Sequence, residues 1–264
     1  MNDIAFSGEA IAIYAILAVI GLALPTAAAL IWRFRFKKGT LAATFIGAAM
    51  FLVFALILET LLHQVMLPVV SGSTVLYCVY GALAAGVFEE TARFLCFRFI
   101  MKKQLSAENA VSYGIGHGGF EAVNILFITS IGIIVMAVSM NSMGTAEFIS
   151  SASGGNEAIA AQLAQQMENY AAINIPQAFL AVYERIVAMA FHISMSIVVM
   201  EAVMIKGKIW LYPTAIVLHA LLDTPAVLYQ NKVIPMWLCF TIMTLYTALI
   251  CFIAARRYRF LKTK

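Results

Sequence analysis

Residues 86–94, GVFEETARF, place three charged side chains in the middle of a mostly apolar run that covers residues 75–101. A charge near the centre of a lipid bilayer costs about 2.5 to 3.5 kcal/mol on insertion scales. On an α-helix, Glu89 and Arg93 share one face, and Glu90 points about 100° away from it. Three charges so close together therefore indicate a helix that faces protein or water inside a membrane.

The composition as a whole is that of a membrane protein. Of the 264 residues, 63% are hydrophobic and only 11% are charged, and the mean hydropathy is +0.92. We expect an all-α, polytopic transmembrane bundle that forms a single integral membrane domain over residues 1–264. About seven spans are predicted, at residues 9–32, 40–63, 72–101, 105–138, 174–205, 208–230 and 234–255.

The basic residues predict the orientation of these spans. With the boundaries above, 14 of the 17 Lys and Arg residues fall on one side of the membrane, and Lys232 falls on the other. The positive-inside rule then predicts an N-terminus outside the cell membrane and a cytoplasmic C-terminus. Topology anchoring accounts for the net charge of +4, so we expect contact with the lipid bilayer and no nucleic-acid partner.

Two other segments bear on the organisation of the chain. The first ten residues carry Asp3 and Glu9 and no basic residue, so we expect an uncleaved first helix rather than a secretory signal. Residues 139–173 are polar and acidic and are predicted to form an extracytoplasmic loop. Within this loop, residues 157–170 have the four-residue apolar spacing of a surface helix, although a plain spacer fits equally well.

Ionisable residues recur at helical spacing inside three later apolar spans. The three sets are His117 with Glu121, Glu184 and Arg185 with His192, and His219 with Asp223. Four residues are about one helical turn and seven are nearly two, so His117 shares a face with Glu121, Arg185 with His192, and His219 with Asp223. Since ionisable side chains avoid lipid, we expect the four helices to bring these groups into one shared interior.

Such an interior fits three uses, which are hydrolysis by activated water, relay of protons or ions, and structural polar contacts between helices. A serine peptidase is disfavoured because no serine has a suitable setting. An aspartyl peptidase needs two intramembrane aspartates, and the spans contain only Asp223. The HExxH motif of zincins is absent from the sequence. Glutamate and histidine side chains that activate water remain as the enzymatic interpretation.

The order of these motifs resembles a known family. Residues 89–93, EETAR, are similar to the EExxR motif of the glutamic-type intramembrane proteases, the superfamily of CAAX prenyl proteases and PrsW proteases. The full set of four motifs resembles most the YhfC branch of bacterial membrane peptidases, over about half of the chain. This resemblance implies an intramembrane endopeptidase of the cell membrane whose substrate is a membrane protein or peptide.

The resemblance also implies roles for individual residues. Glu89 would be the general base that takes a proton from water, oriented by Glu90 or Arg93. His192 and His219 would hold the water and the developing oxyanion.

Four further residues would surround these groups. His117 and Glu121 would complete the pocket, and Glu184 and Arg185 would orient it. Asp223 stands where the prenyl-protease branch often has asparagine. An ionised aspartate would repel an oxyanion, so Asp223 either orients His219 or is itself protonated.

Alternatives remain open both for the metal dependence of the site and for the function of the protein. We expect a metal-independent enzyme without a cofactor, and the alternative is a Zn²⁺ site formed by His117, His192 and His219. The rivals to a peptidase are a non-catalytic membrane scaffold of the same fold and an ion-coupled transporter, although the internal repeat typical of transporters is absent from the sequence. A shared pocket requires Glu89 to lie within about 10 Å of His192 and His219.

Overall fold

A computed structural model describes residues 4–264, and all regular secondary structure in these residues is helical. Within residues 4–264, seven helical segments are long and apolar enough to cross a membrane. The prediction of an all-α protein with about seven spans is therefore confirmed, and the orientation of its termini stays a prediction. Asp3, on which the prediction of an uncleaved first helix partly depends, lies outside the described residues.

The seven spans are Gly8–Arg35, Leu41–Val70, Thr74–Ile100, Ala107–Met143, Ile175–Met204, Leu211–Gln230 and Met236–Leu261. Four of them contain a π-helical segment, labelled η. In chain order the elements are α1 (Gly8–Leu30), η1 (Ile31–Arg35), α2 (Leu41–Phe51), η2 (Leu52–Glu59), α3 (Thr60–Val70), α4 (Thr74–Leu95), η3 (Cys96–Ile100), α5 (Ala107–Ala122), η4 (Val123–Ile128), α6 (Thr129–Met143), α7 (Thr145–Ser153), α8 (Glu157–Ala171), α9 (Ile175–Met204), α10 (Leu211–Gln230) and α11 (Met236–Leu261).

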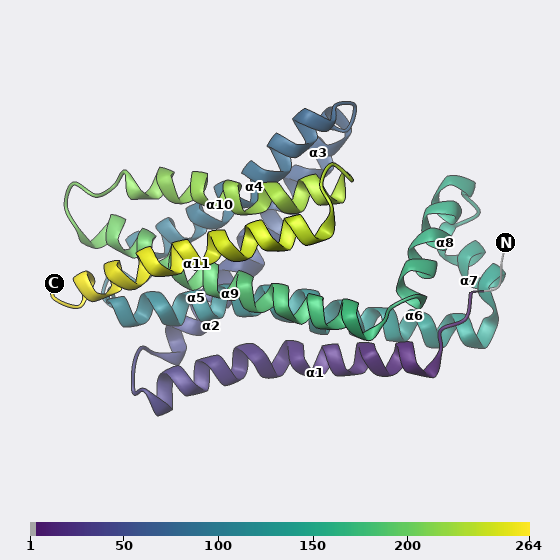
Figure 1. Ribbon diagram of the computed structural model, residues 1–264, viewed down its shortest axis with the longest axis horizontal. Coiled ribbons are helices and arrows are strands. Elements are labelled where there is room, and N and C mark those ends of the chain that lie inside the picture. The colour runs from purple at the N-terminus through teal and green to yellow at the C-terminus, as the bar shows by residue number, and fades with distance from the viewer. Residues whose placement is uncertain (1–3) are drawn as a thin grey trace. The chain divides into compact units, whose positions relative to one another are not determined.

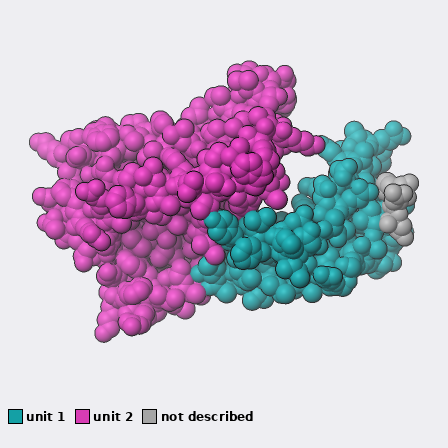
Figure 2. All heavy atoms as spheres, viewed as in Figure 1, with its two compact units in different colours: residues 1–24, 122–183 teal, residues 25–121, 184–264 magenta. Residues whose placement is uncertain are grey.

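The described chain divides into two compact units (Figure 2). Unit 1 contains the residues up to 24 and residues 122–183, and unit 2 contains residues 25–121 and 184–264. The single membrane domain expected from the sequence stays a prediction. Every ionisable residue assigned to the predicted site belongs to unit 2.

Unit 1 contains the segment that the sequence predicts as a loop. This segment is largely helical, because α6 continues to Met143 and is followed by α7 and α8. The side chain of Asn156 accepts hydrogen bonds from the backbone N–H groups of Ala158 and Ile159 and so caps the start of α8. The helix predicted from apolar spacing at residues 157–170 is thus present.

Unit 2 is built around α4. This helix begins after Ser73, whose hydroxyl caps it by accepting from the backbone N–H of Leu76. Helix α10 packs along α4 and also against α11, while α2, η2 and α3 contact α4 as well. Several glycines permit close approach inside the unit, among them Gly86 and Gly114. A Cβ atom at Gly86 would lie 2.8 Å from the backbone oxygen of Ile216 on α10, and one at Gly114 of α5 would lie 2.5 Å from Cα of Ile193 on α9.

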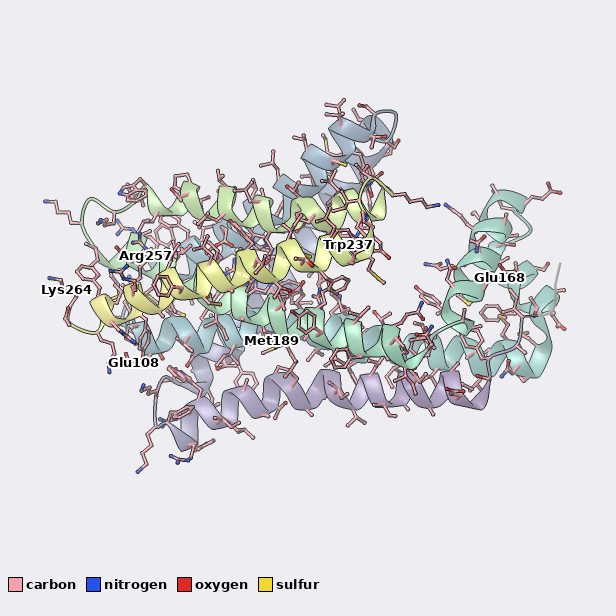
Figure 3. The ribbon with its side chains drawn as sticks, viewed as in Figure 1. Glu108, Glu168, Met189, Trp237, Arg257 and Lys264 are labelled. Carbon is pink, nitrogen blue, oxygen red and sulfur yellow. The ribbon has the colours of Figure 1, made fainter. Side chains whose placement is uncertain are left out.

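The connections of unit 2 collect at its two ends (Figure 1). Those at residues 36–40, 101–106 and 205–210 lie at the same end as the C-terminus, and those at residues 71–73 and 231–235 lie at the other. Arg257 and Lys264 lie at the first end and Trp237 at the second (Figure 3). The basic connections of unit 2 therefore share one end, as the positive-inside interpretation requires.

Candidate functional site

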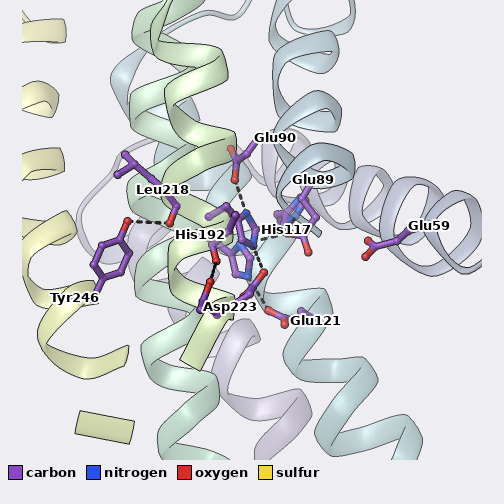
Figure 4. Close-up of polar contacts among 12 residues, drawn as sticks. Glu59, Glu89, Glu90, His117, Glu121, His192, Leu218, Asp223 and Tyr246 are labelled. Carbon is purple, nitrogen blue, oxygen red and sulfur yellow. Dashed lines mark hydrogen bonds and ion pairs between the residues drawn. The ribbon is translucent and has the colours of Figure 1, made fainter. Parts of the chain in front are cut away.

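All ten residues that the sequence assigns to the site form one connected network of hydrogen bonds and ion pairs in unit 2. Figure 4 shows part of this network, with Glu89, Glu90, His117, Glu121, His192 and Asp223 labelled. They come from four helices: Glu89, Glu90 and Arg93 from α4; His117 and Glu121 from α5; Glu184, Arg185 and His192 from α9; and His219 and Asp223 from α10. The groups expected to share an interior are thus brought together.

Helix α4 supplies a buried cation between two buried carboxylates. Glu89, Glu90 and Arg93 are at most 5% exposed. Arg93 donates from Nη1 to Glu90 Oε1, and its Nη2 lies 3.6 Å from Glu89 Oε2. A buried charge is tolerated only when it is paired and hydrogen-bonded, so Arg93 is what allows the two neighbouring carboxylates to lie inside the bundle.

His117 fixes the carboxylate of Glu89. Its Nε2 donates to Glu89 Oε2 at 2.8 Å. The imidazole is fully buried between Phe51, an edge contact with ring centroids 5.1 Å apart, and Tyr113, which stacks on it at 5.8 Å. Packing on both sides limits the ring to one orientation, so His117 positions Glu89 from behind.

The contacts of His192 define which of its nitrogens carries hydrogen. Arg93 Nη2 lies 2.6 Å from His192 Nδ1, and because arginine only donates, Nδ1 is the acceptor. The other nitrogen, Nε2, then donates to Glu121 Oε2 at 2.8 Å. Arg185 holds Glu121 in turn, with Nη1 2.7 Å from Glu121 Oε1 and Nη2 2.7 Å from Glu184 Oε1.

Glu90 orients the ring of His219, as Glu121 orients the ring of His192. Its Nδ1 donates to Glu90 Oε1 at 2.7 Å. The opposite nitrogen, Nε2, lies 3.6 Å from Asp223 Oδ2, which is too long for a hydrogen bond. Within residues 4–264, Asp223 Oδ2 has no hydrogen-bond partner. Asp223 Oδ2 therefore has no short contact, and the same holds for Glu90 Oε2 in the described part of the chain.

Three side chains could hold a metal ion. One donor atom each of Glu89, His192 and His219 lies within 4.8 Å of the other two. The expectation that Glu89 lies within about 10 Å of both histidines is confirmed. This donor set differs from the three histidines considered from the sequence, because Glu89 takes the place of His117, whose Nε2 is engaged by Glu89 itself.

A cavity of about 350 Å³ reaches this cluster. On α4 it follows one face through Tyr77, Gly81, Ala85 and Glu89, which recur every four residues and span about 18 Å. Glu121, Glu184, Arg185, His192, His219 and Asp223 also line it. The side chains of Glu121, Glu184 and Asp223 are 18%, 32% and 26% exposed, so water has access to them. Glu90, Arg93 and His117 lie behind the cavity wall.

A second polar group lies outside the set of residues that the sequence assigns to the site. Glu59 is the buried residue of η2, a segment otherwise made of partly or fully exposed apolar side chains. His63 Nε2 lies 3.4 Å from Glu59 Oε1, and His63 Nδ1 lies 2.6 Å from the hydroxyl of Tyr80. His63 and Tyr80 line the cavity, and the carboxyl group of Glu59 points toward the side of Glu89 (Figure 4). An acid in an apolar span was the available sequence signal for Glu59, whereas no pattern in the sequence pointed to Tyr80, the partner of His63.

Comparison with known proteins defines the family. The model of a family described as YhfC intramembrane metalloprotease matches residues 20–244. The chain is also 35% identical over 236 residues to the uncharacterized membrane protein YhfC of Bacillus subtilis (strain 168), covering 86% of this chain and 88% of the relative. The chain belongs to the YhfC family. No solved structure gives a significant match to this YhfC chain.

The match covers every residue of the network and also Glu59, because residues 59–223 fall between its limits. With seven apolar spans and a bacterial relative named as a membrane protein, this YhfC protein is a multi-pass bacterial membrane protein. The wider likeness to CAAX prenyl proteases and PrsW proteases stays a prediction.

Proposed function

We propose that this YhfC protein is a metal-dependent intramembrane peptidase that holds a divalent ion, zinc in the first place, with Glu89, His192 and His219. The observation that carries the proposal is the convergence of these three donors from α4, α9 and α10 within 4.8 Å. Two histidines and one glutamate are a ligand set of catalytic zinc sites. The description of the family as a metalloprotease supports the same conclusion.

The surroundings of the donors fit a metal. A histidine that binds metal usually donates its other ring N–H to a carboxylate, which fixes the ring and raises its basicity. Both histidines have such a carboxylate, Glu121 at 2.8 Å from His192 and Glu90 at 2.7 Å from His219. The nitrogens left for a metal are therefore Nδ1 of His192 and Nε2 of His219.

A zinc ion bound here would act as a Lewis acid that acidifies water and polarises the substrate carbonyl. In hydrolysis the C–N bond breaks, the water oxygen joins the carbonyl carbon, and a proton from water reaches the leaving nitrogen. We assign that proton transfer to Asp223, because its Oδ2 lacks a hydrogen-bond partner among the described residues and its side chain borders the cavity beside His219.

Arg185 and Glu184 act through Glu121 in this scheme. They hold the carboxylate that fixes the ring of His192, so they are positioning residues. His117 has the same relationship to Glu89.

One observation favours the metal-independent glutamic peptidase expected from the sequence. Arg93 occupies Nδ1 of His192, and His117 donates to Glu89, so the protein itself supplies partners to two of the three donors. In that second candidate mechanism, Glu89 would take the proton from water directly. The two mechanisms differ in whether turnover needs a metal.

The test is cleavage of a panel of membrane-embedded, fluorogenic peptides by purified protein in lipid nanodiscs. We expect the wild-type protein to cleave, 1,10-phenanthroline to abolish this turnover, and added zinc to restore it. Glu89→Gln and His219→Asn should each abolish turnover, and added zinc should not restore it. Glu108→Gln, an acid outside the network, is the control. Turnover that survives chelation but not Glu89→Gln would favour the glutamic mechanism. If both variants cleave at the wild-type rate, the cluster is not an active site.

A further inference from the structure

Unit 2 has a second hollow at the end where its basic connections lie. This groove has a volume of about 410 Å³ and lies between α11 and the end of α9 with the turn that follows. Its lining combines charged and aromatic side chains: Glu201, Lys208, Phe252, Ile253, Arg256, Arg257 and Phe260. Three cations and one acid give the groove a formal charge of +2.

Two of the three cations are free to bind a ligand. Glu201 is 2% exposed and accepts a hydrogen bond from Arg257 Nη1 at 2.8 Å, so this pair neutralises itself. Lys208 and Arg256 form no ion pair with any described residue from 4 to 264. Lys208 lies over the ring of Trp210 at 5.7 Å and Arg256 over that of Phe252 at 5.9 Å.

The groove continues an apolar stripe of the membrane span. Leu245, Leu249 and Phe252 of α11 are 68%, 55% and 62% exposed. Residues at this spacing share a helix face, which also includes Arg256 and Phe260. From Leu249 to Arg256 the helix rises about 10 Å, so a hydrocarbon chain along the stripe would end at the two cations.

We propose that this groove binds an anionic phospholipid, with its phosphate at Lys208 and Arg256 and an acyl chain along the exposed face of α11. Charge and shape select this occupant. A soluble anion would not use the apolar stripe, and a zwitterionic lipid would bring a second cation toward a groove that is already positive. Basic pockets of this kind at one end of a bundle bind anionic headgroups.

The test is native mass spectrometry of the purified full-length protein in detergent, titrated with phosphatidylglycerol or phosphatidylcholine of identical acyl chains. A cation near an anionic lipid contributes about fivefold in affinity, so we expect the double variant K208Q/R256Q to bind phosphatidylglycerol about 25-fold more weakly. The matched control K102Q/K103Q removes two exposed cations from another connection at the same end, and its affinity should stay within about twofold of wild type.

Three results would overturn the proposal. They are unchanged phosphatidylglycerol binding by K208Q/R256Q, equally tight binding of phosphatidylcholine by the wild type, and displacement of phosphatidylglycerol by equimolar inorganic phosphate. Glu201→Gln gives an independent check, because removal of the acid raises the charge of the groove. Provided that its melting temperature shows a folded protein, this variant should bind phosphatidylglycerol more tightly, and weaker binding would also contradict the proposal.

Discussion

Arg93 and His192 meet through the nitrogen that a metal would need. Nη2 of Arg93 donates to Nδ1 of His192 over 2.6 Å, while the opposite nitrogen of the ring donates to Glu121. One lone pair cannot serve both a guanidinium and a metal ion. In the proposed function, metal binding at His192 therefore requires Arg93 to give up this contact.

Substitution of Arg93 tests whether the guanidinium group and a metal ion compete for His192. Arg93→Gln removes the cation that compensates Glu89 and Glu90, and breaking a buried ion pair costs about 3–5 kcal/mol of unfolding free energy. We expect a lower melting temperature without metal and a larger stabilisation by zinc than in wild type, because zinc would neutralise the same carboxylates. Thermal unfolding with and without zinc measures both. Equal stabilisation of the two proteins would show that Arg93 and a metal do not share the site.

The carboxylates behind the histidines should control metal affinity. Glu121→Gln and Glu90→Gln each remove the anionic acceptor of a histidine N–H, and loss of such a partner typically lowers metal affinity 10- to 100-fold. Competition with a chromophoric chelator measures this affinity. Glu184→Gln is the matched control, since Glu184 contacts Arg185 rather than a histidine, and its effect should be several times smaller.

Gly86 should be intolerant of even one methyl group. The Cβ of Gly86→Ala would lie 2.8 Å from the backbone oxygen of Ile216, so α4 and α10 would have to separate. We expect a loss of about 1–3 kcal/mol in unfolding free energy and weaker zinc binding, because His219 would move away from Glu90. Gly72→Ala is the control, since a Cβ atom added at residue 72 would have no neighbour within 4 Å. Wild-type zinc binding in Gly86→Ala would contradict this assignment.

Glu59 should contribute little to zinc binding, in contrast to Glu121 and Glu90. It contacts His63 rather than the three donors, so Glu59→Gln should leave zinc affinity within about threefold of wild type, well below the effect of Glu121→Gln. Tyr80→Phe should cost about 0.5–1.5 kcal/mol of unfolding free energy through the lost hydrogen bond to His63. Chelator competition and denaturant unfolding measure the two effects. A tenfold loss of zinc affinity in Glu59→Gln would place Glu59 inside the metal site.

Sequence spacing predicted the spans and the faces within each helix. Glu89 and Arg93, or His219 and Asp223, share a face because helical geometry repeats every 3.6 residues. The contacts between helices could not be predicted in this way. The pairs Glu90 with His219 and Glu121 with His192 depend on how far each helix rotates and how closely it packs, which Gly86 and Gly114 permit.

The choice of metal donors could not be predicted from the spacing either. Nothing in the spacing distinguishes His117 from His192, and only the placement of α5 within the bundle brings His117 to Glu89. The π-helical segment η2 is also invisible to a 3.6-residue pattern, and it ends at Glu59. The burial of that side chain beside His63 was therefore left open by the sequence.

The most direct test of the central claim is the zinc content and ligand set of the purified protein, measured by elemental analysis and X-ray absorption spectroscopy. We expect one zinc ion per chain with two imidazole ligands and a carboxylate, and its loss in Glu89→Gln and His219→Asn but not in Glu108→Gln. Wild-type protein that binds no zinc, or variants that retain it with unchanged spectra, would show that Glu89, His192 and His219 do not form a zinc site.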